Sequence, residues 1–236
     1  MSLVPFKAFR FANYTCVDVS RRRPVVPVTE NASLWSVMNV MIENEVDRVP
    51  VFNANNLIVA IISKSALIRF IARHSMILGS GAENTIEACM PMEHWEGIYS
   101  IPIHTKALEA FDLIESRRVK GVGIVNSENQ LIHNLSTTDL KGLCDAHFLR
   151  LFLPVPDFLK ETYADSQRIL TPPLTCTPES SLRTVLLQLA CSRLHRIYVI
   201  DGEGKPLGVV TCTDLINILH QLADDPNFEY MQSGKS

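Results

Sequence analysis

The sequence carries little net charge and no long hydrophobic run. Its 22 Lys and Arg residues nearly balance 25 Asp and Glu residues, which leaves a formal net charge of −3 and a pI of about 6.2. A chain without a basic excess does not fit electrostatic binding to nucleic acid, so local cations must meet any anionic ligand. The most apolar stretch, LIVAII at 57–62, is far too short to cross a bilayer, and the N-terminus has no signal-peptide core. We therefore expect neither membrane insertion nor secretion.

The chain also lacks the motifs of the common metal sites and enzymes. Its 6 cysteines are scattered, without a C-x-x-C pair or a histidine cluster at zinc spacing. This spacing predicts that the cysteines are reduced, partly buried thiols and that the protein is in the cytosol or the nucleus. It predicts no metal site. The sequence contains neither G-x-S-x-G nor H-E-x-x-H. It also lacks a P-loop, since GEGK at 202–205 lies in a predicted hairpin turn. We expect a protein without catalytic residues or a catalytic cofactor.

Two parts of the chain repeat each other without a gap, since residues 33–67 align with residues 181–215. Both copies open with apolar residues at helical spacing, a pattern that predicts a helix with one buried face. β-rich runs on either side of a polar turn follow and predict a hairpin, and a Ser/Thr-rich segment then precedes a second helix. The apolar stripes are Leu34, Val37, Met38 and Met41 in one copy and Leu182, Val185, Leu186 and Leu189 in the other.

A middle copy occupies residues 106–140, and a short extended segment leads into each copy. A unit of about fifty residues, with a small sheet covered by helices on one face, leaves its other face apolar, so such units are expected to pair. Because there are three copies, one lacks a partner within the chain. We predict a mixed α/β (α+β) fold with an arm at 1–23, repeats at 24–74, 97–143 and 172–223, linkers that contain some helix at 75–96 and 144–171, and a flexible tail at 224–236.

Residues that suit a nucleotide gather at one end of the third repeat. Thr211, Thr213 and Asp214 stand where the second strand gives way to a helix. The carboxylate can accept hydrogen bonds from both ribose hydroxyls, and the threonines can bind a phosphate or sugar oxygen. Arg196 precedes Thr211 by one hairpin, so His195 and Arg196 are expected at the same sheet edge, where they meet the phosphates. The alternative is structural, because Thr and Asp are also common helix caps.

The middle repeat keeps part of this pattern. Ser136, Thr138 and Asp139 stand at the ribose position. Lys120 takes the place of the histidine, and lysine can still reach a phosphate as a point charge. A capped helix with a surface lysine explains these residues equally well.

The order of the elements, and the Ser/Thr-x-Ser/Thr-Asp opening of the last helix, resemble the cystathionine β-synthase (CBS) domain. Within that superfamily, NASLWSVMNVMIENEVDRVPVF and SRLHRIYVIDGEGKPLGVVTCTDLINIL are similar to the γ regulatory subunit of AMP-activated protein kinase and its relatives. The resemblance implies repeats paired as Bateman modules, and AMP, ADP or ATP bound between them by the residues named above. It also implies a nucleotide contact for Thr177, for which a helix-entry threonine is the alternative.

The first repeat departs furthest from the family pattern. Asp47 replaces the histidine and Ala66 replaces the aspartate, so a phosphate would face an acidic group and a ribose would lack its acceptor. Its own sugar pocket is expected to be empty. Arg48 remains, and it either contributes to a phosphate held by a neighbouring repeat, as the shared channel of the family implies, or forms a plain salt bridge.

The resemblance implies a regulator whose nucleotide shifts its contacts with the catalytic and scaffold subunits of a protein kinase. The alternative is a CBS-fold scaffold or interaction protein without nucleotide control, which the degenerate first repeat favours and Asp139 and Asp214 oppose. The family usually carries four repeats, and the three here resemble its second, third and fourth. A short relative, a homodimer through the unpaired repeat and a truncated four-repeat protein all remain open.

Overall fold

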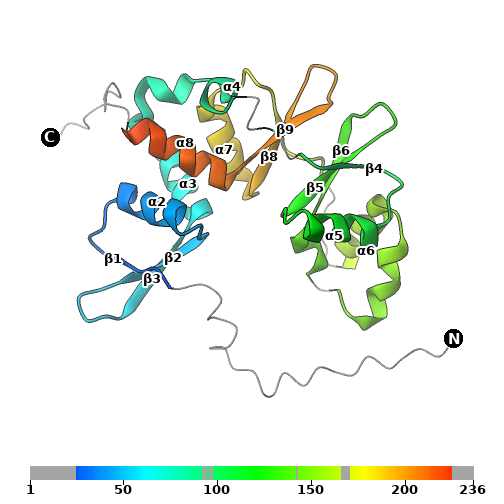
Figure 1. Cartoon of the computed structure of the whole chain (residues 1–236), viewed down its shortest axis with the longest axis horizontal. Helices are drawn as coiled ribbons and strands as arrows, with labels where there is room; N and C mark the ends of the chain where they lie inside the picture. The colour runs from blue at the N-terminus through cyan, green and yellow to red at the C-terminus, as the bar shows by residue number, and fades with distance from the viewer. Residues whose placement is uncertain (1–24, 92–94, 96–97, 142, 166–170, 225–236) are drawn as a thin grey trace. The chain divides into compact units, whose positions relative to one another are not determined.

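The computed structural model describes residues 25–91, 95, 98–141, 143–165 and 171–224 (Figure 1). By its internal contacts the chain divides into two compact units, Met1–Ser63 and Lys64–Ser236. The predicted arm at 1–23, and all but the first residue of the predicted tail, lie outside the described residues.

The first unit is a small sheet with one helix. Its elements are β1 (Val28–Thr29), α2 (Leu34–Glu43), β2 (Arg48–Phe52) and β3 (Ile58–Ser63). β1 runs parallel to β2, and β2 runs antiparallel to β3. Ser33 caps α2, because its hydroxyl accepts a hydrogen bond from the Ser36 amide at 3.1 Å. Val37, Met38 and Met41 of the predicted apolar stripe are the buried residues of this helix.

The second unit contains the other two sheets and most of the helices. It opens with α3 (Lys64–Arg73), the 3-10 segment η2 (Ser75–Glu83) and α4 (Ile86–Cys89). The middle repeat contributes β4 (Ser100–Pro102), α5 (Ala107–Ser116), β5 (Gly121–Val125), β6 (Leu131–Ser136), the 3-10 turn η4 (Thr137–Leu140), the 3-10 segment η5 (Asp145–Phe152) and α6 (Val155–Asp165). The third repeat contributes β7 (Thr175–Cys176), α7 (Leu182–Ser192), β8 (Arg196–Ile200), β9 (Pro206–Thr211) and α8 (Cys212–Asp224).

The three sheets share one topology, which confirms the predicted fold of three strand-helix-hairpin repeats. Each sheet joins a short parallel pair to an antiparallel hairpin. The backbone conformation also repeats. In every repeat, one residue after the first helix and one residue in the hairpin turn are left-handed, a conformation that ends helices and fits tight turns. These residues are Glu45, Arg118 and Arg193 after the helices, and Asn56, Asn129 and Gly204 in the turns.

The middle repeat differs from the other two after its second strand. The first repeat continues into α3, which has 10 residues, and the third into α8, which has 13. The middle repeat continues into η4, which has only 4. Its β-branched Thr137 and Thr138, with a glycine at position 142, disfavour a longer helix at this point.

The apolar segment at the end of the middle repeat packs within the chain. Val155, Phe158 and Leu159 of α6 are fully buried in one cluster with residues of α5 and β5. The Ala107 amide donates to the Leu153 carbonyl at 2.9 Å and ties this segment to the start of α5. The stretch expected as a linker from residue 144 therefore carries η5 and α6, which complete the core of the middle repeat.

α3 packs against α7 and α8 of the third repeat. Leu67, Ile68 and Ile71 are among its buried residues. η2 also contacts α7, and the Leu182 amide at the start of α7 donates to the Asn84 carbonyl at 2.9 Å. The closing helix of the first repeat thus belongs to the same core as the helices of the third.

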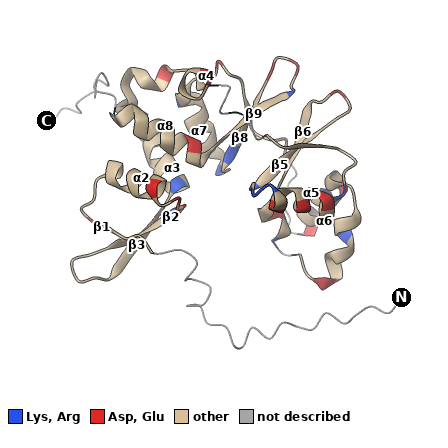
Figure 2. Ribbon diagram, viewed as in Figure 1, with Lys and Arg blue, Asp and Glu red and all other residues tan. Residues whose placement is uncertain are grey.

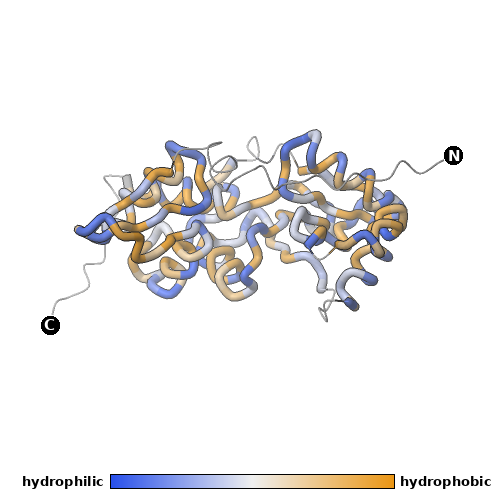
Figure 3. The backbone as a smooth tube through the Cα atoms, turned by 90° about the horizontal axis from the view of Figure 1, so that it is seen from below, coloured by the Kyte–Doolittle hydropathy of each residue, from blue (hydrophilic) through white to orange (hydrophobic). Residues whose placement is uncertain are grey.

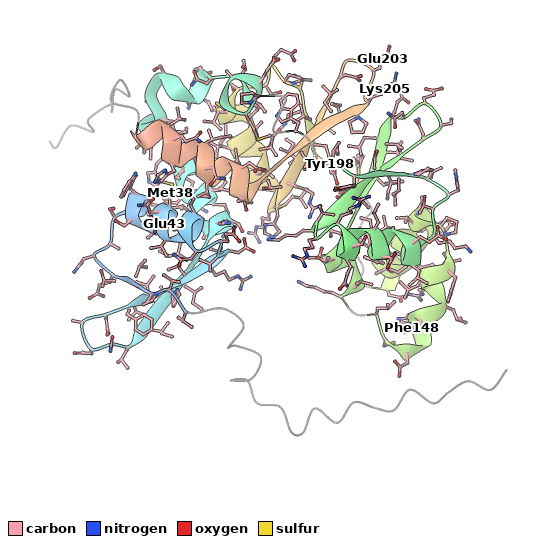
Figure 4. The ribbon with its side chains drawn as sticks, in the orientation of Figure 1. Met38, Glu43, Phe148, Tyr198, Glu203 and Lys205 are labelled. Carbon is pink, nitrogen blue, oxygen red and sulfur yellow. The ribbon has the colours of Figure 1, made fainter. Side chains whose placement is uncertain are left out.

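The second and third sheets contact each other through the glycine-bearing face of β5. An added Cβ on Gly123 would lie 3.5 Å from Tyr198 Cε1, and one on Gly121 would overlap the Arg196 guanidinium. The Tyr198 hydroxyl donates a hydrogen bond to Asn134 Oδ1 at 2.6 Å (Figure 4). The two glycines therefore allow the long side chains of β8 to pack against β5.

The described residues include neither a disulfide nor a helix that is long and apolar enough to cross a membrane. Hydrophobic residues lie along the helices and strands, and hydrophilic residues gather at the turns (Figure 3). The described cysteines are free thiols, and burial raises the pKa of Cys176 to about 12. Such a thiol stays protonated and unreactive at neutral pH.

Candidate functional site

The N-terminal ends of α3 and α8 lie side by side. Lys64 is buried, with 7% of the residue exposed, and its ammonium group donates a hydrogen bond to Thr213 Oγ1 at 3.1 Å. Ser65 Oγ lies 3.4 Å from Nδ1 of the exposed His195. We call these four residues, Lys64, Ser65, His195 and Thr213, the helix-start cluster.

The helix-start cluster has the chemistry of an anion site. Both helices present their N-terminal ends there, where the backbone amides carry partial positive charge. Lys64 adds a full positive charge, and Ser65 and Thr213 add hydroxyl donors. His195 is held by its backbone, because its carbonyl accepts a hydrogen bond from the Cys212 amide at 3.1 Å. A phosphate is the biological anion that this combination of helix starts, cation and hydroxyls suits best.

Asp214 acts as a helix cap with one carboxylate oxygen. Its Oδ2 accepts hydrogen bonds from the Thr211 amide and the Thr211 hydroxyl, both at 2.7 Å. The Thr211 hydroxyl in turn accepts from the Asp214 and Thr213 amides at 3.4 and 3.2 Å. No hydrogen bond of the described residues uses Asp214 Oδ1, and the residue is half-buried. Capping and ligand binding are therefore compatible at this residue.

Arg196 and His195 do not meet at one place. Arg196 pairs with Thr211 across the hairpin, so both stand at the predicted sheet edge. Its guanidinium lies over Gly121, however, and near the Tyr198 hydroxyl, where it opposes part of the rise in the Tyr198 pKa that burial causes. Consecutive residues of an extended strand point to opposite faces, so His195 contacts α3 while Arg196 contacts β5. Figure 2 shows the basic residues at the starts of β8 and β5.

In the middle repeat, the aspartate is buried and fully engaged. Asp139 is 2% exposed, and its Oδ2 accepts hydrogen bonds from the Ser136 amide at 2.8 Å and the Ser136 hydroxyl at 3.0 Å. Its Oδ1 accepts from the Tyr163 hydroxyl of α6 at 2.9 Å. Ser136 Oγ also lies 2.6 Å from Thr138 Oγ1, while Lys120 is exposed. These contacts favour the capping alternative over a ribose contact.

Replacing Asp139 with alanine is expected to lower the free energy of unfolding by about 1–3 kcal/mol, because the variant leaves half-buried donors of Ser136 and Tyr163 without their acceptor. Urea denaturation followed by circular dichroism measures the change. Asp112→Ala is the matched control, since Asp112 is exposed on α5. Equal stability of the two variants would contradict the capping role.

The remaining predicted residues lie elsewhere. Arg48 is exposed in the first unit, where it pairs with Ser63 in the hairpin. No salt bridge of the described residues includes it, so the plain salt bridge that the sequence left open is absent from this part of the chain. Thr177 is exposed before α7, and its amide donates to Ser180 Oγ at 3.0 Å, while Ser181 is the cap of that helix.

Sequence reasoning missed Lys64 and Ser65. They align with Cys212 and Thr213 of the third repeat, but they contact that repeat instead of completing a site in their own. A lysine at the first position of a helix that follows an apolar strand is an available signal, because basic residues are unfavourable at helix starts without an anionic partner. In the described part of the chain, no group of three or more His, Cys, Asp or Glu residues has the geometry of a metal site.

The chain matches one family model and several known proteins. The family model of the CBS domain matches residues 17–73 and 167–221. The chain is 26% identical over 227 residues to the protein MJ1225 of Methanocaldococcus jannaschii, with 92% of this chain and 75% of that protein covered. It is 25% identical to the SNF1-related protein kinase regulatory subunit gamma-1 of Arabidopsis thaliana, with 89% of this chain and 54% of that subunit covered. It is 24% identical to the human 5'-AMP-activated protein kinase subunit gamma-3, with 84% and 40% covered.

Solved structures have the same fold. A conserved protein of Pyrococcus horikoshii superimposes with a TM-score of 0.61 at 23% identity, with 84% of this chain and 80% of that chain covered. MJ1225 superimposes with a TM-score of 0.60, with 83% and 67% covered. The chain spans about half or less of the length of the plant and human kinase subunits. The chain thus carries two segments that match the CBS-domain model, and it resembles the γ subunits of AMP-activated protein kinase.

Proposed function

We propose that this protein binds an adenine nucleotide, AMP, ADP or ATP, at the third repeat and thereby regulates a partner. The helix-start cluster holds the phosphate, and Asp214 accepts a hydrogen bond from the ribose with Oδ1. The observation that carries the proposal is the approach of Lys64 and Ser65 of α3 to Thr213 and His195. This approach places the Lys64 cation and the N-terminal ends of α3 and α8 near the Asp214 carboxylate, whose Oδ1 accepts no hydrogen bond from the described residues.

The base and the partner are proposed from the relatives. Two similar proteins are named as γ subunits of an AMP-activated or SNF1-related protein kinase, which supports adenine as the base and a kinase catalytic and scaffold subunit as partners. A bound nucleotide changes a partner's activity only if it binds two arrangements of the complex with different affinity. The free thiols of the described cysteines support a reducing compartment, the cytosol or the nucleus.

The third repeat is the proposed principal site. In the middle repeat Asp139 is saturated by protein donors, and in the first repeat Asp47 and Ala66 replace the binding residues. Arg196 and Lys120 are then left for secondary contacts with phosphates. A scaffold without nucleotide control is the competing function, and the loss of two sites out of three favours it.

Calorimetric titration with AMP and with 2'-deoxy-AMP tests the role of Asp214. The wild-type protein is expected to prefer AMP, because the deoxy analogue removes one of the ribose hydroxyls that donates to the carboxylate. Hydrogen bonds to charged groups contribute about 1.5–3 kcal/mol, so the preference is expected to be roughly tenfold or more.

Asp214→Ala is expected to bind AMP more weakly and to lose the preference for ribose, whereas Asp112→Ala behaves as wild type. Circular dichroism verifies that Asp214→Ala is folded. A ribose preference that persists in folded Asp214→Ala would overturn the assignment of the sugar contact.

A further inference from the structure

An exposed thiol lies beside a histidine where the 3-10 segment η5 begins. Cys144 immediately precedes η5, and its Sγ lies 3.5 Å from Nδ1 of His147. The His147 amide also donates a hydrogen bond to the Cys144 carbonyl at 2.8 Å. Residues three apart lie one above the other in a 3-10 helix, so the local fold brings the two side chains together. Phe148, the next residue of η5, marks this segment in Figure 4.

The other ring nitrogen of His147 faces a carboxylate. His147 Nε2 lies 3.7 Å from Asp165 Oδ2 at the end of α6, and Arg150 donates a hydrogen bond to the same oxygen. Arg150 is itself held by α6, since its Nε lies 2.9 Å from Glu161 Oε2. A proton on Nε2 faces Asp165, so Nδ1 is left to accept the thiol proton. Cys144, His147 and Asp165 thus have the order of a nucleophile, a base and a carboxylate that orients the base.

Cys191 is exposed as well, but it lacks such neighbours. It is a free thiol on α7, and no hydrogen bond or ion pair of the described residues includes its side chain. The other described cysteines are less exposed, since Cys176 and Cys212 are buried and Cys89 is half-buried. A thiol reacts when it is accessible and can lose its proton. Among the described cysteines, only Cys144 combines exposure with an adjacent base.

We propose that Cys144 is a modification site, where the thiol forms a mixed disulfide with a small-molecule disulfide. His147 Nδ1 accepts the thiol proton while the Cys144 sulfur attacks one sulfur of the disulfide. A new S–S bond forms, the old one breaks, and the departing thiolate takes the proton from His147. The Cys144 sulfur is thereby oxidised and the departing sulfur is reduced. Such a disulfide is transient in a reducing compartment, and its formation does not depend on nucleotide binding to the third repeat.

Reaction of the reduced full chain with glutathione disulfide, followed by mass spectrometry of its tryptic peptides, tests the proposal. Cys144 and Cys191 fall on different peptides, so one experiment compares their rates. At neutral pH, Cys144 is expected to react at least about tenfold faster than Cys191, because a base adjoins its thiol. A smaller ratio would overturn the proposal.

His147→Gln keeps a polar side chain and removes the base. At neutral pH it is expected to slow the reaction of Cys144 about tenfold and to leave Cys191 unchanged. At about pH 9.5 thiols ionise without a base, so the variant and the wild-type protein are expected to react at similar rates. His104→Gln, which changes an exposed histidine of the same repeat, is the matched control. A rate at Cys144 that His147→Gln leaves unchanged at neutral pH, or lowers equally at both pH values, would also overturn the proposal.

Discussion

Replacing Lys64 with methionine is expected to weaken AMP binding roughly ten- to a hundredfold and to leave adenosine binding unchanged. Methionine keeps the unbranched apolar stem, which is buried, and removes only the ammonium group that reaches Thr213. Hydrogen bonds to charged groups contribute about 1.5–3 kcal/mol, and more where water is excluded. Adenosine has no phosphate, so its affinity reports the base and sugar contacts alone.

Calorimetric titration with AMP and adenosine separates the two effects. Lys160→Met is the control for the loss of one positive charge, because Lys160 is exposed on α6 in the middle repeat. Equal weakening of AMP and adenosine in folded Lys64→Met would indicate a disturbed pocket rather than a lost phosphate contact. Unchanged AMP binding would remove Lys64 from the site.

Replacing Phe158 with alanine is expected to lower the free energy of unfolding by about 3–5 kcal/mol, the usual cost of removing a buried aromatic side chain. Phe158 is 0% exposed, and its ring meets that of Phe111 edge to face with centroids 5.6 Å apart. The cost is large because the side chain lies at the junction of α5 and α6 in the core of the middle repeat.

Phe148→Ala provides the matched control for Phe158→Ala. Phe148 belongs to the same apolar segment but is 52% exposed, and Figure 4 shows it at the edge of the second unit. Its removal is expected to change stability by about 0.5 kcal/mol or less. Guanidinium denaturation of both variants measures the difference. Equal effects would contradict the placement of α6 in the core.

The fold was largely predictable because local signals agree along the chain. The apolar stripe of Val37, Met38 and Met41 predicts the buried face of α2, and the polar turns predict the hairpins. The short η4 was less predictable, because its opening sequence, Ser-Thr-Thr-Asp at 136–139, is similar to Thr-Cys-Thr-Asp at 211–214, which opens the 13-residue helix α8.

The candidate site was only partly predictable, because it depends on which repeats pack together. His195, Thr213 and Asp214 were recognisable from one repeat alone. Lys64 reaches Thr213 only through the packing of α3 against α8, which no local pattern specifies. Asp139 looks equivalent to Asp214 in the sequence. Its engagement by Tyr163 depends on α6, a helix that follows only the middle repeat.

The separation of His195 from Arg196, in contrast, could have been predicted from the sequence. Neighbouring residues at a strand start point to opposite faces, so two consecutive side chains seldom reach one phosphate from a regular strand. In the structure, His195 accordingly lies beside Ser65, whereas Arg196 lies over Gly121.

Calorimetric titration of the wild-type protein with AMP, ADP and ATP tests the central claim most directly. The account predicts saturable binding of at least one of the three, with a single nucleotide per chain, because only the third repeat combines a carboxylate oxygen free of protein donors with the helix-start cluster. Absence of binding by all three nucleotides would contradict the account, and the CBS-fold scaffold would then be the better description of this protein.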